Sequence, residues 1–252
     1  MLLENLQMKV MSNNFIEIYE NALSNDLCDL LIEEFEYMDS IGYTHKGVTG
    51  GTGNDKSNID VKDSQDINFI TMYNRYKDEN STLSFVNGKS YSDFFEEIGD
   101  ISYKFLRKYD EKYDWHGEFI NLKENDFWWD TQMPPIKNDW YIESRFILID
   151  TCLMKKYKKN EQGYHIFHAD FDGRANLWNK RSHVIMFYLN DVEEGGETEF
   201  YNQKVKIKPK KGTCVIFPTY NTHLHKGHIP ISNDKYILNM WFKPGYHTPD
   251  KK

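Results

Sequence analysis

The chain has 252 residues, 39% hydrophobic and 15% aromatic, so it can bury a sizeable core as one domain. Its formal net charge of −8 and the absence of a Lys/Arg block argue against a nucleic-acid surface, because phosphate binding needs clustered cations. With three unpaired cysteines, no signal-peptide pattern at its start and no apolar run of membrane-spanning length, it is expected to be cytoplasmic and to bind no membrane.

The N-terminal half predicts helices with loops between them. A short strand is expected at 15–19, and Ser24 can cap a helix whose apolar side chains fall on one face. A second helix is predicted over about 92–113, where apolar residues again recur at helical spacing. Between them, residues 42–66 are polar and contain almost no apolar side chains, which predicts a long loop without packed elements, either a flap over a substrate or surface disorder.

The most informative motif is His168-Ala-Asp170, in a segment that reads as a strand over 164–170. Side chains i and i+2 of a strand project from one face, so this imidazole and carboxylate can take adjacent positions on one metal ion. They would supply two thirds of a 2-His-1-carboxylate facial triad. The motif alone is weak, because three-residue matches arise by chance and a strand can present both residues to solvent.

The segments after this motif supply further histidines and a cation. Residues 181–200 contain a β-branched and aromatic run, an acidic turn with Gly195-Gly196 and a second run, which together predict a hairpin. Further strands are predicted at 205–207, 213–218 and 235–242, and the histidines between the last two are His223, His225 and His228.

Taken together, these motifs resemble the 2-oxoglutarate- and Fe(II)-dependent oxygenases, specifically the prolyl-4-hydroxylase-like branch. That branch runs from a Tyr through His-x-Asp, Y-L-N, G-G-E-T-x-F and P-x-x-G to a distal His, which a Lys follows ten residues later. The resemblance is close over residues 141–244 and looser toward the N-terminus. The matching residues, in the same order, are Tyr157, His168-Ala-Asp170, Tyr188-Leu-Asn190, Gly195 to Phe200, Pro209 to Gly212, His225 and Lys235.

The resemblance implies a mainly β fold with a double-stranded β-helix (jelly-roll, cupin-like) core. We expect this catalytic core over about 141–244 and supporting α-helices over about 15–113, in a single Fe(II)/2-oxoglutarate dioxygenase domain of residues 1–252. The apolar stripes of the two predicted helices would then pack on the outer face of the β-helix.

The same resemblance implies a set of site residues. His168, Asp170 and His225 would hold Fe(II) and leave positions open for 2-oxoglutarate and O₂. Lys235 would neutralise the far carboxylate of 2-oxoglutarate in an apolar pocket, where an unpaired charge is costly, and Tyr157 would donate a hydrogen bond beside it. Tyr157 lies eleven residues before His168, farther than is usual in the family.

The remaining histidines are not expected to bind metal, with one exception. His223 would share the strand face of the distal ligand if this segment is extended, so it is the fallback for His225. His228 reads as a turn residue, and His165 and His183 read as satisfied or surface histidines because no partner spacing recommends them.

The implied activity is hydroxylation of a substrate with release of succinate and CO₂, using Fe(II), 2-oxoglutarate, O₂ and ascorbate. The branch favours a prolyl residue of a peptide or protein, while free amino acids and small metabolites stay open as substrates. Arg174 and Trp241 are candidate substrate contacts, although Trp241 also reads as a core residue. The tryptophan-rich stretch 115–140 could form one wall of a substrate cleft or an irregular connection.

Two alternatives of other classes follow from the same residues. A binding module could keep the fold without turnover, but it predicts degraded ligands or a missing anchor. A cupin-type metal enzyme that does not use 2-oxoglutarate would have no need of Lys235. The sequence does not indicate an oligomeric state.

Overall fold

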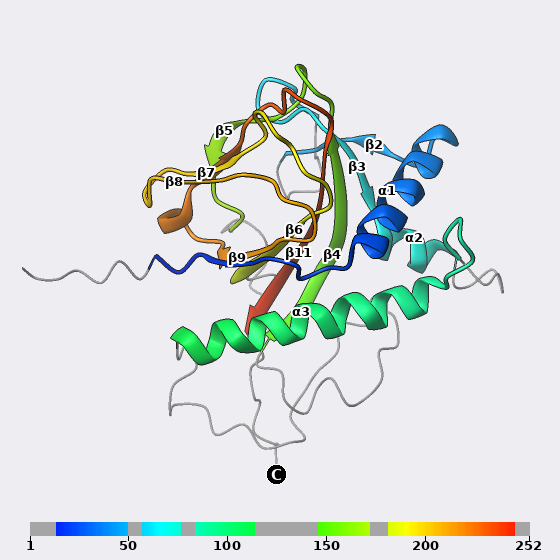
Figure 1. Ribbon diagram of the computed structural model, residues 1–252, viewed down its shortest axis with the longest axis horizontal. Coiled ribbons are helices and arrows are strands. Elements are labelled where there is room, and N and C mark those ends of the chain that lie inside the picture. The colour runs from blue at the N-terminus through cyan, green and yellow to red at the C-terminus, as the bar shows by residue number, and fades with distance from the viewer. Residues whose placement is uncertain (1–13, 50–56, 77–83, 114–145, 172–180, 245–252) are drawn as a thin grey trace, which may run out of the picture.

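The computed structural model describes residues 14–49, 57–76, 84–113, 146–171 and 181–244. Two antiparallel sheets form a double-stranded β-helix, and three α-helices lie outside it (Figure 1). The helices are α1 (Asn25–Ser40), α2 (Phe69–Tyr76) and α3 (Tyr91–Tyr113). The strands are β1 (Glu17–Tyr19), β2 (His45–Lys46), β3 (Gln65–Asn68), β4 (Phe146–Tyr157), β5 (Tyr164–His168), β6 (His183–Tyr188), β7 (Thr198–Phe200), β8 (Val205–Ile207), β9 (Cys214–Pro218), β10 (His225–Gly227) and β11 (Lys235–Pro244).

The larger sheet has seven strands in the order β1-β9-β6-β11-β4-β3-β2. All six residues of β6 are buried, because the helices cover one face of this sheet and the four-stranded sheet covers the other. Alternate residues therefore enter two different cores: Ile185 and Phe187 pack with the helices, whereas Val184 and Met186 face the interior of the β-helix.

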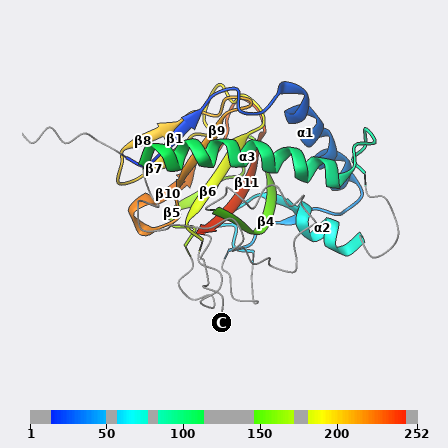
Figure 2. The same ribbon diagram turned by 90° about the horizontal axis from the view of Figure 1, so that it is seen from below.

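The helices form as their sequence patterns predict. Ser24 is the N-cap of α1, and its side chain accepts a hydrogen bond from the backbone N–H of Leu27 at 3.2 Å. Helix α3 runs across the outer face of the seven-stranded sheet (Figure 2). Its buried side chains, which include Phe94 and Phe105, join those of α1 in one apolar core against that face.

The smaller sheet has the order β5-β10-β7-β8, and this topology overturns the predicted hairpin over 181–200. Strand β6 pairs with β9 and β11, whereas β7 pairs with β10 and β8 in the other sheet. Gly195 and Gly196 have φ of +73° and +72°, as the predicted turn requires, but the turn carries the chain from one sheet to the other. A Cβ on Gly195 would lie 2.4 Å from the carbonyl oxygen of Ile229, so only glycine fits there.

The prediction of a loop without packed elements over 42–66 was also wrong for the described parts of that segment. Strand β2 pairs with β3, and residues 61–63 form backbone hydrogen bonds with 163–165 beside β5. Lys62 and Asp66 are 4% and 1% exposed and form an ion pair, so this segment packs through polar contacts rather than apolar ones. Its proposed role as a substrate flap stays a prediction.

Two further expectations concern single residues and long helices. Cys28, Cys152 and Cys214 are buried free thiols, as their apolar settings predict.

In the ranges that the structure describes, no helix combines the length and the apolar character that a membrane span would need.

Candidate metal centre

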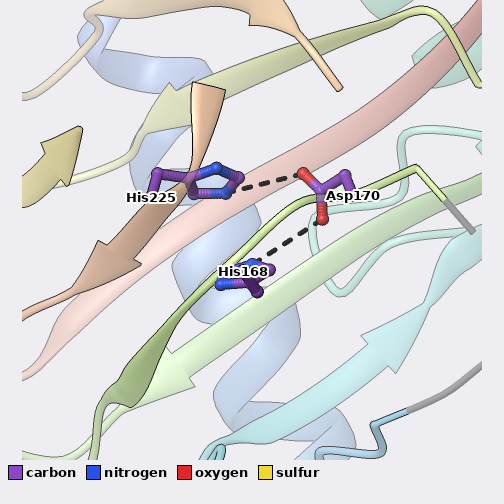
Figure 3. Close-up of side chains that lie close together, drawn as sticks. All are labelled: His168, Asp170 and His225. Carbon is purple, nitrogen blue, oxygen red and sulfur yellow. Dashed lines mark ion pairs between the residues drawn. The ribbon is translucent and has the colours of Figure 1, made fainter. Parts of the chain in front are cut away.

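Three side chains converge at one end of the four-stranded sheet (Figure 3). The Nε2 atom of His168 lies 3.8 Å from Oδ1 of Asp170, and Nε2 of His225 lies 3.6 Å from Oδ2 of the same carboxylate. One potential ligand atom from each residue lies within 4.8 Å of the other two. Both nitrogen–oxygen separations are too long for direct hydrogen bonds, and they leave room for an ion that all three atoms face.

Strand pairing brings the two histidines together. Strands β5 and β10 are antiparallel neighbours, and His225 lies directly opposite His168 in their register. The imidazole ring centroids are 4.3 Å apart. Strand β5 ends at His168, so the predicted strand over 164–170 is two residues too long and Asp170 lies in the bend that follows. The carboxylate nevertheless faces both imidazoles.

The environment keeps both imidazoles neutral, which is the form that binds a metal ion. Burial lowers the pKa of His168 to about 3 and also lowers the pKa of His225. Burial by itself would raise the pKa of Asp170, but the adjacent histidines, Lys155 and Arg181 outweigh it, so the net shift is downward and the carboxylate is ionised at neutral pH.

Neighbouring groups fix the orientation of each imidazole. The Nδ1 atom of His225 lies 3.0 Å from the carbonyl oxygen of His223, and a hydrogen bond donated from Nδ1 leaves Nε2 free to bind a metal. The ring of Tyr164 stacks on His168 with centroids 3.6 Å apart, and Phe217 meets His225 edge-on at 4.8 Å. Two neutral imidazoles and one carboxylate on one side of a shared space are the donor set of an Fe(II) facial triad, so these residues fit that metal.

A buried lysine lies near Gly227, two residues beyond His225 in β10. Lys235 is 2% exposed and begins β11 directly opposite Tyr157 of β4. Its ammonium donates a hydrogen bond to the carbonyl oxygen of Gly196 at 2.7 Å and lies 5.5 Å from the centroids of the Tyr157 and Tyr188 rings. Burial lowers the pKa of Lys235 to about 7. An anion in this pocket would restore the protonated form.

The structure gives three of the other histidines contacts outside this centre. His223 lies in a 3-10 helix, Asn221–His223, and its Nε2 is 2.9 Å from the carbonyl oxygen of Asn14, so the extended segment required for its fallback role is absent. His228 follows β10 and contacts Glu199 at 2.6 Å. His183 is buried in β6 against Tyr109.

The structure describes one of the two candidate substrate contacts. Trp241 is 3% exposed in β11, lines the β-helix interior, and has no hydrogen-bond partner for its indole N–H among the described residues. Its ring belongs to the interior core, and its role as a substrate contact stays a prediction. Arg174 and the whole of the tryptophan-rich stretch 115–140 lie outside the described residues.

Sequence reasoning missed three charged residues of the interior, namely Lys62, Asp66 and Lys155. Lys155 lies two residues before Tyr157 on the same face of β4, and Asp66 lies opposite it on β3. The position of Lys155 relative to Tyr157 could have indicated an inward-facing lysine. Nothing in the polar segment around Asp66 signalled burial.

Comparison with known proteins agrees with this geometry. Residues 152–243 match the family model described as the 2OG-Fe(II) oxygenase superfamily. This segment is thus similar in sequence to 2OG-Fe(II) oxygenases. A putative prolyl 4-hydroxylase from Acanthamoeba polyphaga mimivirus is 35% identical over 68 residues, which cover 24% of this chain. The aligned part spans only 28% of that relative.

Solved structures share the fold of this chain. The viral collagen prolyl hydroxylase of Paramecium bursaria Chlorella virus-1, in complex with 2OG, superposes with a TM-score of 0.52 at 22% identity, covering 92% of this chain and 98% of that one. A Pseudomonas putida prolyl-4-hydroxylase gives a TM-score of 0.54 at 15% identity, covering 91% and 92%. A Trichoplax adhaerens prolyl hydroxylase, bound to a hypoxia inducible factor peptide fragment, gives 0.54 at 14% identity, covering 92% and 84%.

Proposed function

We propose that this chain is an Fe(II)- and 2-oxoglutarate-dependent dioxygenase that hydroxylates its substrate. The substrate that we propose is a prolyl residue of a peptide or protein. The convergence of His168, Asp170 and His225 on one space carries the proposal. When bound, Fe(II) and 2-oxoglutarate supply the oxidising chemistry, in which one atom of O₂ enters succinate, the other enters the product as hydroxyl, and CO₂ is released.

The chain's own residues have separate tasks in this proposal. The two imidazoles and the Asp170 carboxylate hold the metal on one side and leave its other positions open. Lys235 and Tyr157 bind the far carboxylate of 2-oxoglutarate, because a buried ammonium is the partner that an otherwise unpaired carboxylate needs. The β-helix core excludes bulk water around both groups, which strengthens these interactions.

Support for the prolyl substrate comes from the relatives, and the structure itself supplies little of it. The matched mimivirus protein is described as a putative prolyl 4-hydroxylase, and the solved neighbours are prolyl hydroxylases. The same proposal includes a single catalytic domain. It also includes the use of O₂ and ascorbate, which the resemblance to these enzymes implies. Free proline and small metabolites are the competing substrates.

The test of the metal and cosubstrate sites is anaerobic titration of purified protein with Fe(II) and then 2-oxoglutarate. Chelation of the 2-oxo acid to Fe(II) gives a weak visible charge-transfer band, and we expect this band in the wild-type protein. His168→Ala and His225→Ala should abolish it, because each removes one of three ligands. His223→Ala is the matched control and should retain the band, since His223 bonds to Asn14 instead.

The outcomes separate the competing functions. Absence of the band in folded wild-type protein would favour a binding module that retains the fold without turnover. Loss of the band in His223→Ala with retention in His225→Ala would reverse the assignment of the distal ligand. For the substrate, prolyl peptides should stimulate succinate formation above the level without substrate. If neither prolyl peptides nor free proline does so, the prolyl version is wrong.

A further inference from the structure

A second buried lysine faces the interior of the oxygenase domain, and the proposed function leaves it unused. Lys155 is 6% exposed and lies opposite Asp66 of β3 and Ile237 of β11. Within the described ranges, its ammonium has no hydrogen bond and no ion pair; its one recorded contact is the ring of Trp241, whose centroid lies 5.3 Å away.

The two nearby carboxylates are committed to other partners. Asp66 accepts hydrogen bonds from Lys62 at 2.5 Å and from Ser64 at 2.7 Å, and its charge is neutralised by Lys62. Asp170 is a proposed metal ligand, so its charge would be taken up by the metal ion. Neither carboxylate lies within 4 Å of the Lys155 ammonium as an ion pair, so among the described residues the charge of Lys155 has no directly paired counterion.

A lysine in this state is costly to the free protein. An unpaired ammonium on a largely buried side chain loses most of its hydration without a compensating partner. Burial, with a contribution from Lys62, lowers the pKa of Lys155 to about 8, so the side chain still carries a proton at neutral pH. An apolar side chain of similar length would be more favourable here unless an anion binds.

The position of Lys155 distinguishes it from Lys235. Tyr157 and Lys235 face each other at one level of the interior, and Lys155 projects from the same face of β4 two residues away, with its ammonium reaching toward Trp241. The guanidinium of Arg181 lies 4.3 Å from the centroid of the same indole ring. Two cations therefore lie near the Trp241 ring, six residues along β11 from Lys235.

Unsatisfied polar atoms occur at the same place. The indole Nε1 of Trp241 is buried, and so is Oδ1 of Asn239, which lies two residues before it on the same face of β11; neither has a partner among the described residues. Buried polar atoms in native proteins nearly always have partners, supplied by protein, water or ligand. A donor N–H beside two cations suits a carboxylate.

We propose that Lys155 is a second carboxylate-binding group of this pocket, separate from Lys235, and that Trp241 Nε1 donates to the same carboxylate. This inference rests on the proposed function, in which the pocket binds 2-oxoglutarate and the substrate. The carboxylate has two possible sources: the C1 carboxylate of 2-oxoglutarate, which would lie at the metal, or a carboxylate of the substrate. Both present the same chemistry to Lys155.

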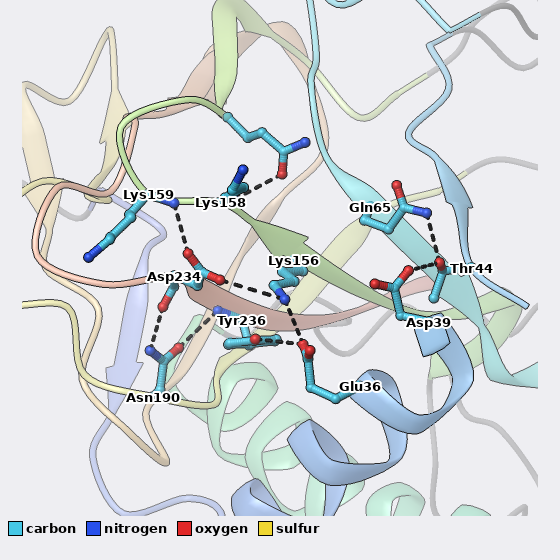
Figure 4. Close-up of polar contacts among 11 residues, drawn as sticks. Glu36, Asp39, Thr44, Gln65, Lys156, Lys158, Lys159, Asn190, Asp234 and Tyr236 are labelled. Atoms are coloured by element: carbon cyan, nitrogen blue, oxygen red, sulfur yellow. Dashed lines mark hydrogen bonds and ion pairs between the residues drawn. The ribbon is translucent and has the colours of Figure 1, made fainter. Parts of the chain in front are cut away.

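Lys156 provides a matched control on the same strand. It points to the opposite face of β4, where it contacts Glu36 at 2.8 Å and Asp234 at 3.6 Å (Figure 4). Tyr236 also donates to Glu36, at 2.7 Å, so this lysine belongs to a satisfied polar network outside the β-helix interior. Lys155→Met and Lys156→Met thus remove the same charge from the two faces of one strand.

The first readout is thermal unfolding of metal-free protein with and without 2-oxoglutarate. Without ligand, Lys155→Met should have a Tm equal to or above that of the wild type, because it removes an unpaired buried charge. If Lys155 binds a carboxylate of 2-oxoglutarate, the ligand should raise the Tm of the wild type and of Lys156→Met, and raise that of Lys155→Met less.

The second readout separates the two sources in the Fe(II)-loaded protein under anaerobic conditions. If the carboxylate is C1 of 2-oxoglutarate, Lys155→Met should weaken 2-oxoglutarate binding roughly tenfold or more, in titrations of the charge-transfer band, with iron still bound. If the carboxylate belongs to the substrate, 2-oxoglutarate affinity should stay within about twofold, a change worth less than 1 kcal/mol. In that case N-acetyl-L-proline, but not N-acetyl-L-prolinamide, should shift the band of the wild type and not that of Lys155→Met.

The proposal is wrong if Lys155→Met changes neither 2-oxoglutarate affinity nor the difference between the acid and amide probes. It is equally wrong if Lys156→Met reproduces the effects of Lys155→Met. Failure of the proposed function looks different: the wild-type protein would then give no charge-transfer band at all, while the thermal measurement would still report whether Lys155 contributes to 2-oxoglutarate binding.

Discussion

The seven-stranded sheet separates two cores that differ in the polar groups they contain. On the helix side, apolar side chains of α1 and α3 pack on the sheet, and the buried carboxylate of Glu34 is satisfied by the hydroxyl of Tyr91 at 2.6 Å and the N–H of Val86 at 2.9 Å. On the β-helix side, Lys155 and Lys235 are buried cations. Trp241 Nε1 and Asn239 Oδ1 there have no partner within the described part of the chain.

Because of this difference, neighbouring residues of one strand contribute to different properties of the protein, one to stability and the next to the candidate site. Each strand of the sheet presents alternate residues to the two cores, so a change at one residue affects packing and a change at the next affects the site. The helix-side core has the composition of a protein interior whose role is folding. The β-helix side carries charges that cost folding free energy and that ligands would compensate.

The largest expected effect comes from the helix-side core. Phe94 is fully buried and contacts Phe69, Phe85 and Phe95 at centroid distances of 5.6, 5.0 and 5.3 Å. Phe94→Ala should lower the free energy of unfolding by about 3–5 kcal/mol, because it leaves a cavity as well as losing apolar contacts. Denaturant unfolding measures this loss. If the separation of the two cores holds, the variant that remains folded should keep wild-type affinity for 2-oxoglutarate.

The matching change on the β-helix side is Lys235→Ala. It should weaken 2-oxoglutarate binding by roughly 30-fold or more, since removing one partner of a buried charge pair costs about 2–5 kcal/mol. Fe(II) binding should be retained. Any decrease in the free energy of unfolding should be no larger than the loss of the side-chain contacts of Lys235 accounts for. Unchanged 2-oxoglutarate affinity would remove the anchor role. Lys226→Ala, which alters a half-buried lysine that faces Glu199, is the control.

Glu34 tests whether the helix side tolerates an imperfectly satisfied polar group. Glu34→Gln keeps the shape but places an amide N–H₂ where one of the two donors, Tyr91 Oη–H or Val86 N–H, needs an acceptor. We expect a loss of about 1–3 kcal/mol in the free energy of unfolding. Titrations of Fe(II) and 2-oxoglutarate should be unaffected. A stability equal to that of the wild type would mean that the network can rearrange at no cost.

Local signals in the sequence predicted the elements, and non-local pairing limited the rest. The helix after Ser24 follows from its cap and its apolar stripe, and the structure confirms it at Asn25–Ser40. The prediction of a hairpin over 181–200 was wrong because the pattern of apolar residues identifies strands but not the strands with which they pair. The glycine turn at Gly195-Gly196 is compatible with a hairpin and with a crossover between sheets, and only the complete topology decides between them.

The candidate site shows the same limit. His168, Asp170 and His225 are 57 residues apart at most, and their convergence was expected from the family's motif order rather than from local pattern. Their roles as ligands stay a proposal. Lys155 and Lys156 are adjacent and chemically identical in the sequence, and only the register of β4 against its neighbours shows that one faces inward and the other outward. Burial of Asp66 depended on an ion pair with Lys62, which carries no periodic signal.

The smallest expected effect is the pH dependence of stability that the interior lysines impose. Burial lowers the pKa of Lys235 to about 7 and that of Lys155 to about 8, below the value of roughly 10.4 for an unfolded lysine. Between these values the unfolded chain binds more protons than the folded chain, so both lysines make stability rise with pH above about 7. Each contributes at most about 1.4 kcal/mol per pH unit to the free energy of unfolding.

Urea unfolding of the ligand-free wild type and of Lys235→Met from pH 6.5 to 8.5 measures how this free energy changes with pH in each protein. Subtracting the two curves cancels the titrating groups that both proteins share. Wild-type stability should rise more steeply with pH than that of the variant; parallel curves would mean that Lys235 keeps its ordinary pKa and that the β-helix side is better solvated than its burial indicates.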